Sequence, residues 1–275
     1  MKTINALQAI AASIVLTACA SVPPPQQPIR VNLGDSYEIY RAPLLDQTNH
    51  TLQHLNQNKD ILYSQTYGGG GAGVGVLLGP LGVLANIKAI ESNTMKDVAA
   101  LKNKININPN QVFFNSANKN GLAIKTDSSN KSLKFNPYLL VEKTEGDIIM
   151  LAAVVLIDEG GTKQTFPTKY LVQLPITYTF AEMSNLDATK NKVLETYVEK
   201  SFAVLIARIK SEATANPATE EKITVISEFL TPRFKYQMAG SLIEKTNEYT
   251  WVRIIGGVCG VRNGDITVKK IATKK

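Results

Sequence analysis

The feature that most limits the fold of this chain is a change of hydrophobic pattern near residue 122. From there on, apolar residues come in short runs, separated by turn sequences such as Asp127-Ser-Ser-Asn130 and Glu145-Gly146-Asp147. Turns this short favour antiparallel pairing of consecutive strands. We therefore expect an α+β fold in which residues 122–275 form a mostly antiparallel sheet.

The expected strands share alternating or continuous apolar sequence: Leu122–Thr126, Leu133–Glu142, Ile148–Ile157, Phe166–Phe180, Lys222–Leu230, Arg233–Glu244, Tyr249–Val261 and Ile266–Ile271. Residues 150–157 are apolar almost throughout, so this strand should be central and covered on both faces. Asn263-Gly264 predicts a hairpin between the last two strands, because both residues tolerate positive φ.

A long amphipathic helix is predicted for residues 187–212, between the two groups of strands. Its apolar residues recur at intervals of three and four: Leu194, Val198, Phe202, Leu205 and Ile209. This spacing places them on one face of a helix. We expect that face to cover the sheet.

Residues 31–121 are expected to form a mainly helical N-terminal part. Helices are predicted over residues 44–62 and over most of 91–120, with Asn108-Pro109 as a start signal and Gly121 as a stop. His50 and His54 are the only histidines and would share a helical face. Two interpretations stay open: a weak candidate for half of a zinc site, or part of a solvated polar face.

The most unusual stretch is the glycine-rich segment 68–82, which holds eight of the chain's eighteen glycines. No charged residue occurs from Ile61 through Ile87. Gly71, Gly75 and Gly79 are spaced four apart, and on a helix they would form a flat strip that lets another backbone approach closely. Packing on the protein's own core, self-association and contact with a membrane all remain possible uses of this strip.

The N-terminus carries Lys2, an uncharged apolar run from Ile4 to Leu16, and then Leu16-Thr17-Ala18-Cys19. A run of this length suits a secretory signal and is too short to span a bilayer. The last four residues resemble the lipobox of bacterial lipoproteins. That resemblance implies removal of residues 1–18 and acylation of Cys19, which leaves 275 − 18 = 257 residues. With Ala20 next, it also implies the periplasmic face of the outer membrane.

Residues 19–30 read as the acylated cysteine followed by a tether rich in proline and glutamine, which favours extended conformations. Removal of Lys2 takes the formal charge from +7 to +6, so the mature chain stays basic and should be attracted to lipid phosphates or acidic polymers. Export makes nucleic acid an unexpected partner. If Cys19 is acylated, Cys259 has no partner for a disulfide, and we expect it to be a buried apolar residue.

No nucleophile elbow, phosphate-binding loop or complete metal-ligand set is evident in the sequence, so we expect a non-enzyme without a cofactor. The leading hypothesis is a lipoprotein of the outer membrane with a structural or binding role in the cell envelope, self-associating through Gly71, Gly75 and Gly79. The alternatives are an accessory subunit of a secretion or transport complex and a tethered envelope hydrolase.

Overall fold

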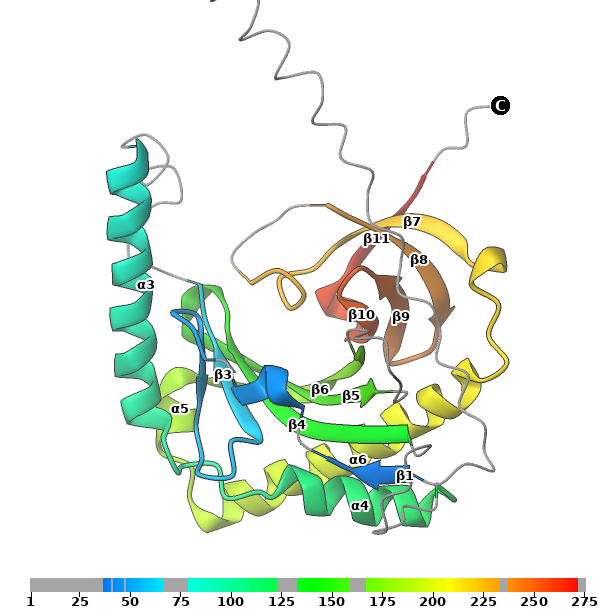
Figure 1. Cartoon of the computed structure of the whole chain (residues 1–275), viewed down its shortest axis with the longest axis horizontal. Coiled ribbons are helices and arrows are strands. Elements are labelled where there is room, and N and C mark those ends of the chain that lie inside the picture. The colour runs from blue at the N-terminus through cyan, green and yellow to red at the C-terminus, as the bar shows by residue number, and fades with distance from the viewer. Residues whose placement is uncertain are drawn as a thin grey trace, which may run out of the picture.

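The computed structural model describes residues 37–40, 42–46, 48–66, 79–122, 133–158, 167–232 and 237–271. Their strands form one 11-stranded sheet of order β11-β7-β8-β9-β10-β6-β5-β4-β3-β2, with β1 paired to β4 (Figure 1). The strands are β1 (Tyr37–Ile39), β2 (Leu52–His54), β3 (Ile61–Ser64), β4 (Leu133–Lys143), β5 (Ile148–Asp158), β6 (Thr168–Thr179), β7 (Glu221–Ile226), β8 (Met238–Lys245), β9 (Tyr249–Ile254), β10 (Gly257–Arg262) and β11 (Thr267–Lys270). The helices are α3 (Gly79–Leu101), α4 (Pro109–Lys119), α5 (Phe180–Ser184) and α6 (Ala188–Glu212), with short 3-10 turns η1 (Pro43–Asp46), η2 (Glu145–Asp147), η3 (Pro217–Thr219) and η4 (Asn263–Asp265).

The centre of the sheet is the antiparallel meander β4–β5–β6, as the short turns predict. Strand β5 pairs with β4 on one side and with β6 on the other. Its alternate residues enter two different cores: Leu151, Ala153 and Val155 on one face, Ala152 and Val154 on the other. The predicted central position of this strand is confirmed.

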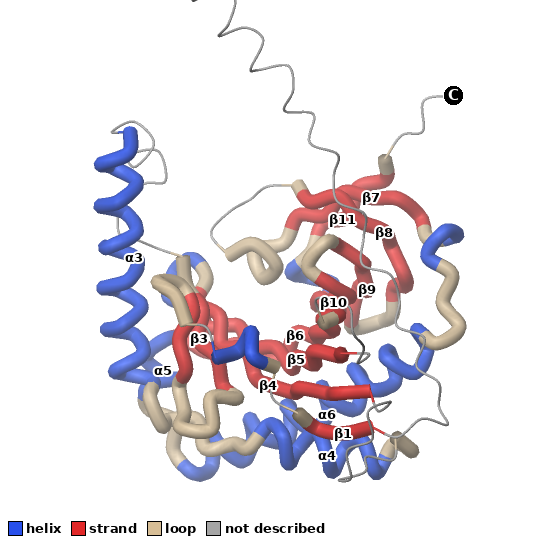
Figure 2. Tube along the Cα trace, viewed as in Figure 1, coloured by secondary structure: helices blue, strands red, loops and turns tan. Residues whose placement is uncertain are grey.

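The prediction of a helix over residues 44–62 is wrong, because this region forms η1 and the hairpin β2–β3 (Figure 2). Asparagine side chains set the two turns. The Asn49 Oδ1 accepts hydrogen bonds from the backbone N–H groups of Thr51 and Leu52, both at 2.8 Å. The Asn56 Oδ1 accepts from the N–H groups of Asp60 and Ile61, both at 3.2 Å. Such side-chain bonds compete with helix formation and favour turns.

Three pairs of neighbouring strands are parallel and bring distant segments together. Strands β1 and β3 both pair with β4, and β10 pairs with β6. The N-terminal residues 37–66 therefore belong to the same sheet as residues 133–271, instead of to a separate helical part. The fold is α+β with a mostly antiparallel sheet.

The end of the chain differs from the prediction in two places. The expected strand 249–261 is two strands, β9 and β10, which pair with each other; the second begins at Gly257, whose φ is +127°. The expected hairpin at Asn263-Gly264 does not form, because β11 pairs with β7. Asn263 instead accepts a hydrogen bond from Thr250 and donates to the carbonyl of Thr246, which fixes η4 against the β8–β9 turn.

Helices α4 and α6 lie together on one face of the sheet, which confirms the predicted covering helix (Figure 1). Asp187 and Asn108 cap their first turns, and Gly121, with φ +70°, follows α4 as the predicted stop. The sheet curls away from these helices, so that residues of β7, β9 and β10 meet residues of β3, β4 and β5 in a second core. Cys259 lies in this second core with no exposed surface, and burial raises its pKa to about 12.

Candidate functional site

Of the α3 side chains that the structure describes, residues 84–101, the buried ones begin at Ile90. Ile90, Thr94, Val98 and Leu101 are buried, one turn apart along a single face. The Gln65 Nε2 donates to the Thr94 Oγ1 at 2.6 Å and to the Ile90 carbonyl at 2.9 Å. These hydrogen bonds tie the middle of α3 to the residue that follows β3.

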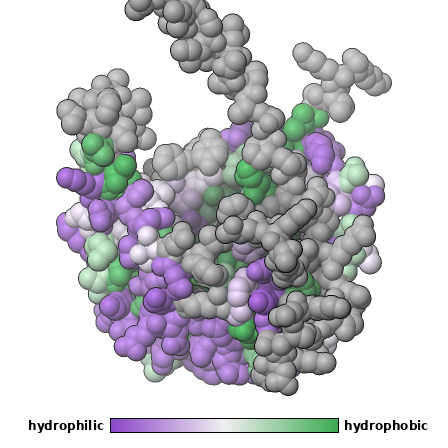
Figure 3. Space-filling model, in the orientation of Figure 1, coloured by the Kyte–Doolittle hydropathy of each residue, from purple (hydrophilic) through white to green (hydrophobic). Residues whose placement is uncertain are grey.

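The N-terminal half of α3 projects away from the sheet, and we call residues 79–89 the free half of α3 (Figure 1). Its 11 residues span about 16 Å at 1.5 Å per residue. Leu84 is 57 % exposed, and Ala85, Asn86 and Lys88 are exposed as well. Apolar surface is visible near the end of this helix in Figure 3. The Leu84 side chain on this projecting half is therefore reachable by a partner.

Only some of the predicted site residues belong to the described part of the chain. Gly79 is the first residue of α3, at the outer end of its free half. Cys19, Gly71 and Gly75 lie outside the described residues. The sequence identified the segment that leads to the tip, but it did not indicate that the helix would leave the body.

The two histidines do not share a helical face. His50 lies in the turn before β2 and His54 ends that strand, where it pairs with Leu62 of β3. In the ranges that the structure describes, no group of three or more histidine, cysteine, aspartate or glutamate side chains could hold a metal ion. Within the same ranges, no helix is long and apolar enough to cross a membrane.

A buried carboxyl group that the sequence analysis missed lies on the curled face of the sheet. Glu142 is 8 % exposed, and among the described residues it has no hydrogen bond or ion pair. Burial raises its pKa to about 8, and the positive charge of Lys169 offsets only part of this effect. Its partner in β5 is Met150, which borders a hollow of about 340 Å³. The signal in the sequence was an acidic residue at the end of an apolar run.

A second buried charge is fully enclosed by the C-terminal strands. Arg253 has no exposed surface, and its Nη2 lies 2.8 Å from the Glu212 Oε2 and 2.7 Å from the Glu220 Oε1. Glu212 also lies 3.3 Å from Arg208. These bonds join the last turn of α6 to β9, so we assign the cluster a structural role.

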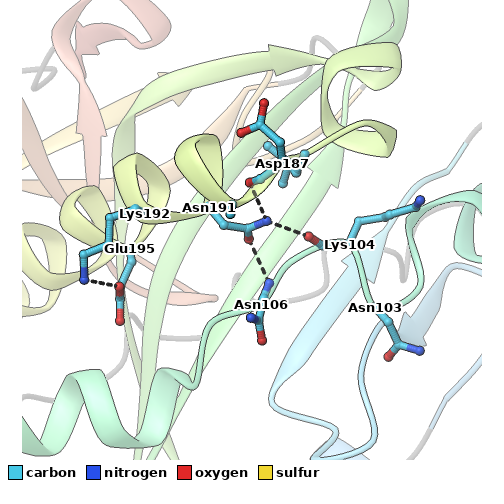
Figure 4. A pocket seen from close by; sticks show the side chains of 9 residues that line it. Asn103, Lys104, Asn106, Asp187, Asn191, Lys192 and Glu195 are labelled. Atoms are coloured by element: carbon cyan, nitrogen blue, oxygen red, sulfur yellow. Dashed lines mark hydrogen bonds and ion pairs between the residues drawn. The ribbon is translucent and has the colours of Figure 1, made fainter.

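A polar hollow of about 440 Å³ lies between residues 103–106 and the start of α6 (Figure 4). At its centre the Asn191 Oδ1 accepts from the backbone N–H of Asn106 at 2.8 Å. The Asn191 Nδ2 donates to the carbonyls of Lys104 and Asp187. Both the oxygen and the nitrogen of the Asn191 amide are therefore already hydrogen-bonded. These bonds fix the start of α6 to the segment that follows α3.

Comparison of the chain with protein-family models, with curated proteins and with solved structures finds no match in any of the three. The free half of α3 and the buried carboxyl of Glu142 are therefore judged on their own geometry. The first is exposed and reachable by a macromolecule. The second is enclosed, and we expect it to affect the stability of the fold.

Proposed function

We propose that the protein is a lipoprotein of the cell envelope, held by acylated Cys19 at the periplasmic face of the outer membrane. Its role is structural or binding, and the free half of α3 is the surface that meets the partner. The observation that carries this proposal is the 57 % exposure of Leu84 on a helix that stands clear of the sheet. Because this helix projects from the body, the Leu84 side chain is within reach of a macromolecular partner.

The sequence on the N-terminal side of this surface supports the same role. The charge-free run from Ile61 through Ile87 leads directly into α3 and contains the glycine strip. Gly79 is the first residue of the free half of α3. Small residues spaced four apart, as Gly71, Gly75 and Gly79 are in the sequence, suit close contact between apolar surfaces.

Self-association is the second candidate function for the same surface, because Gly71, Gly75 and Gly79 would let two helices approach. In that case replacement of Gly75 by Leu lowers the mass that light scattering reports for the chain from residue 19 with Cys19→Ser. An accessory role in a secretion or transport complex would instead appear as a co-purifying protein that Leu84→Asp removes.

The anchor is tested by growing cells that produce the full chain with radiolabelled palmitate. We expect label on the protein and none on a Cys19→Ala copy, because acylation requires the thiol. Label that persists in the Cys19→Ala copy, or an unlabelled wild type, would contradict the anchor. Recovery of the protein with outer-membrane vesicles after cell fractionation tests the location.

A further inference from the structure

We infer that the partner of the free half of α3 is the acyl-chain region of one membrane leaflet. This inference rests on the proposed function, since it names what that surface meets. The free half extends about 16 Å from the body, and half of a bilayer's hydrocarbon core is about 15 Å thick. The helix is therefore long enough to enter one leaflet as far as the bilayer centre, and too short to cross both leaflets.

The distribution of charge along α3 matches this depth. Leu84 and Ala85 belong to the charge-free run, and Lys88 is the first charged residue after it. Lys88 is exposed and lies at the inner end of the free half, one helical turn after Leu84. A lysine at this position can keep its ammonium group among lipid phosphates while the leucine lies in the hydrocarbon.

A second element presents a similar combination on the same side of the molecule. In the view of Figure 1, the C-terminal end of β11 and the free end of α3 both point away from α4 and α6. Lys269 is exposed in β11, and Ile271, directly after that strand, is 47 % exposed. Two apolar side chains on separate elements, each near an exposed lysine, can touch a flat anionic surface at the same time. A lipid headgroup layer has this shape and charge.

A flotation experiment tests the inference without the lipid anchor. The chain from residue 19 with Cys19→Ser includes every described residue, and it is mixed with vesicles of phosphatidylethanolamine and phosphatidylglycerol. We expect it to float with the vesicles. Leu84→Asp should weaken binding about tenfold or more, because an ionised carboxylate is strongly disfavoured in hydrocarbon. Lys269→Gln should weaken it about fivefold, and vesicles of phosphatidylcholine alone should bind less.

The matched control is Val193→Asp. Val193 is 45 % exposed on α6, which lies on the opposite side of the molecule (Figure 1). This variant should float as the wild type does, and the melting temperatures of all variants show that each chain is folded. Equal binding of Leu84→Asp and the wild type would overturn the inference.

The remaining outcomes separate this inference from the proposed function. If the wild type does not float and light scattering shows a dimer that Leu84→Asp converts to a monomer, the partner is a second copy. That result overturns the lipid assignment and supports the free half of α3 as a contact surface. If the wild type is a monomer that does not float, the lipid assignment is also overturned. Co-purification of an envelope protein then tests the contact surface: loss of that protein in Leu84→Asp supports it, and retention contradicts it.

Discussion

At the scale of single residues, the described part of the chain buries three carboxylates, which differ in their hydrogen-bond and ion-pair partners. Asp60 accepts hydrogen bonds from Asn56 and Asn110, and Glu212 lies against two arginines. Glu142 has neither kind of partner. Burial disfavours the charged form of Glu142, and the charge of Lys169 offsets only part of this effect, so Glu142 should make the stability depend on pH.

Replacing Glu142 with Gln should stabilise the fold by about 3 kcal/mol at pH 7, because one pKa unit corresponds to 1.36 kcal/mol. The folded-state pKa is about 8 and the ordinary value is 4.5. Below about pH 4.5 the carboxyl is protonated in both states and costs nothing. Between that pH and about 8 the unfolded chain releases a proton that the folded chain keeps, so the wild type loses stability as the pH rises.

Urea denaturation from pH 4 to pH 9 measures this effect. The stability of Glu142→Gln should lie near that of the wild type at pH 4, and the difference should widen up to about pH 8. Parallel curves for the two proteins over the whole range would show that Glu142 is ionised or solvated in the folded chain.

Arg253→Met should destabilise the protein by about 3–5 kcal/mol, because it leaves the buried carboxylate of Glu212 with Arg208 alone and removes the arginine from Glu220. Adding Glu212→Gln should recover part of the loss, since the uncompensated charge is removed. Lys192→Met, which breaks an exposed pair with Glu195, is the control and should leave the melting temperature close to that of the wild type. An Arg253→Met protein as stable as the control would contradict the structural role of this cluster.

At the scale of elements, the sequence predicted well those parts whose partners are close along the chain. The meander β4–β5–β6, the helix α6 and the capped helix α4 follow from periodicity and from local signals such as Asn108-Pro109. The pairings of β1 and β3 with β4, and of β10 with β6, depend on contacts between distant segments. Hydrophobic periodicity carries no information about such partners. Where a helix was expected, the side chains of Asn49 and Asn56 bond to the backbone and form turns instead.

The pairing of β10 with β6 depends on one glycine, which gives an element-scale prediction. A Cβ on Gly257 would lie 2.2 Å from the Lys169 carbonyl oxygen, and its φ is +127°. Gly257→Ala should therefore cost about 2 kcal/mol or more through strain and displacement of β10. Gly264→Ala is the matched control, because a Cβ there meets nothing within 4 Å. Thermal melting checks both variants, and equal midpoints would contradict the close approach of the two strands.

At the scale of the whole molecule, a curled sheet with helices on one face carries a helix that extends beyond it. The apolar, glycine-rich run that precedes this helix could be identified from the sequence, because charge and composition require no knowledge of contacts. Whether α3 would lie on the body or leave it depends on where the buried face of the helix ends. That limit is set by Gln65 and Ile90, whose hydrogen bond joins residues 25 positions apart.

The central claim is that an acylated chain places the free half of α3 in a leaflet, and one measurement tests it most directly. The acylated Leu84→Cys protein is reconstituted in phosphatidylethanolamine and phosphatidylglycerol vesicles and labelled with a polarity-sensitive fluorophore. Among the described residues the other thiol, Cys259, is buried and should not react. A Val193→Cys protein serves as the reference. We predict that the fluorophore at position 84 has a blue-shifted emission and is quenched by lipids that carry a spin label in the middle of the acyl chain. The fluorophore at position 193 should show neither effect. Equal, water-like emission at both positions would contradict the account.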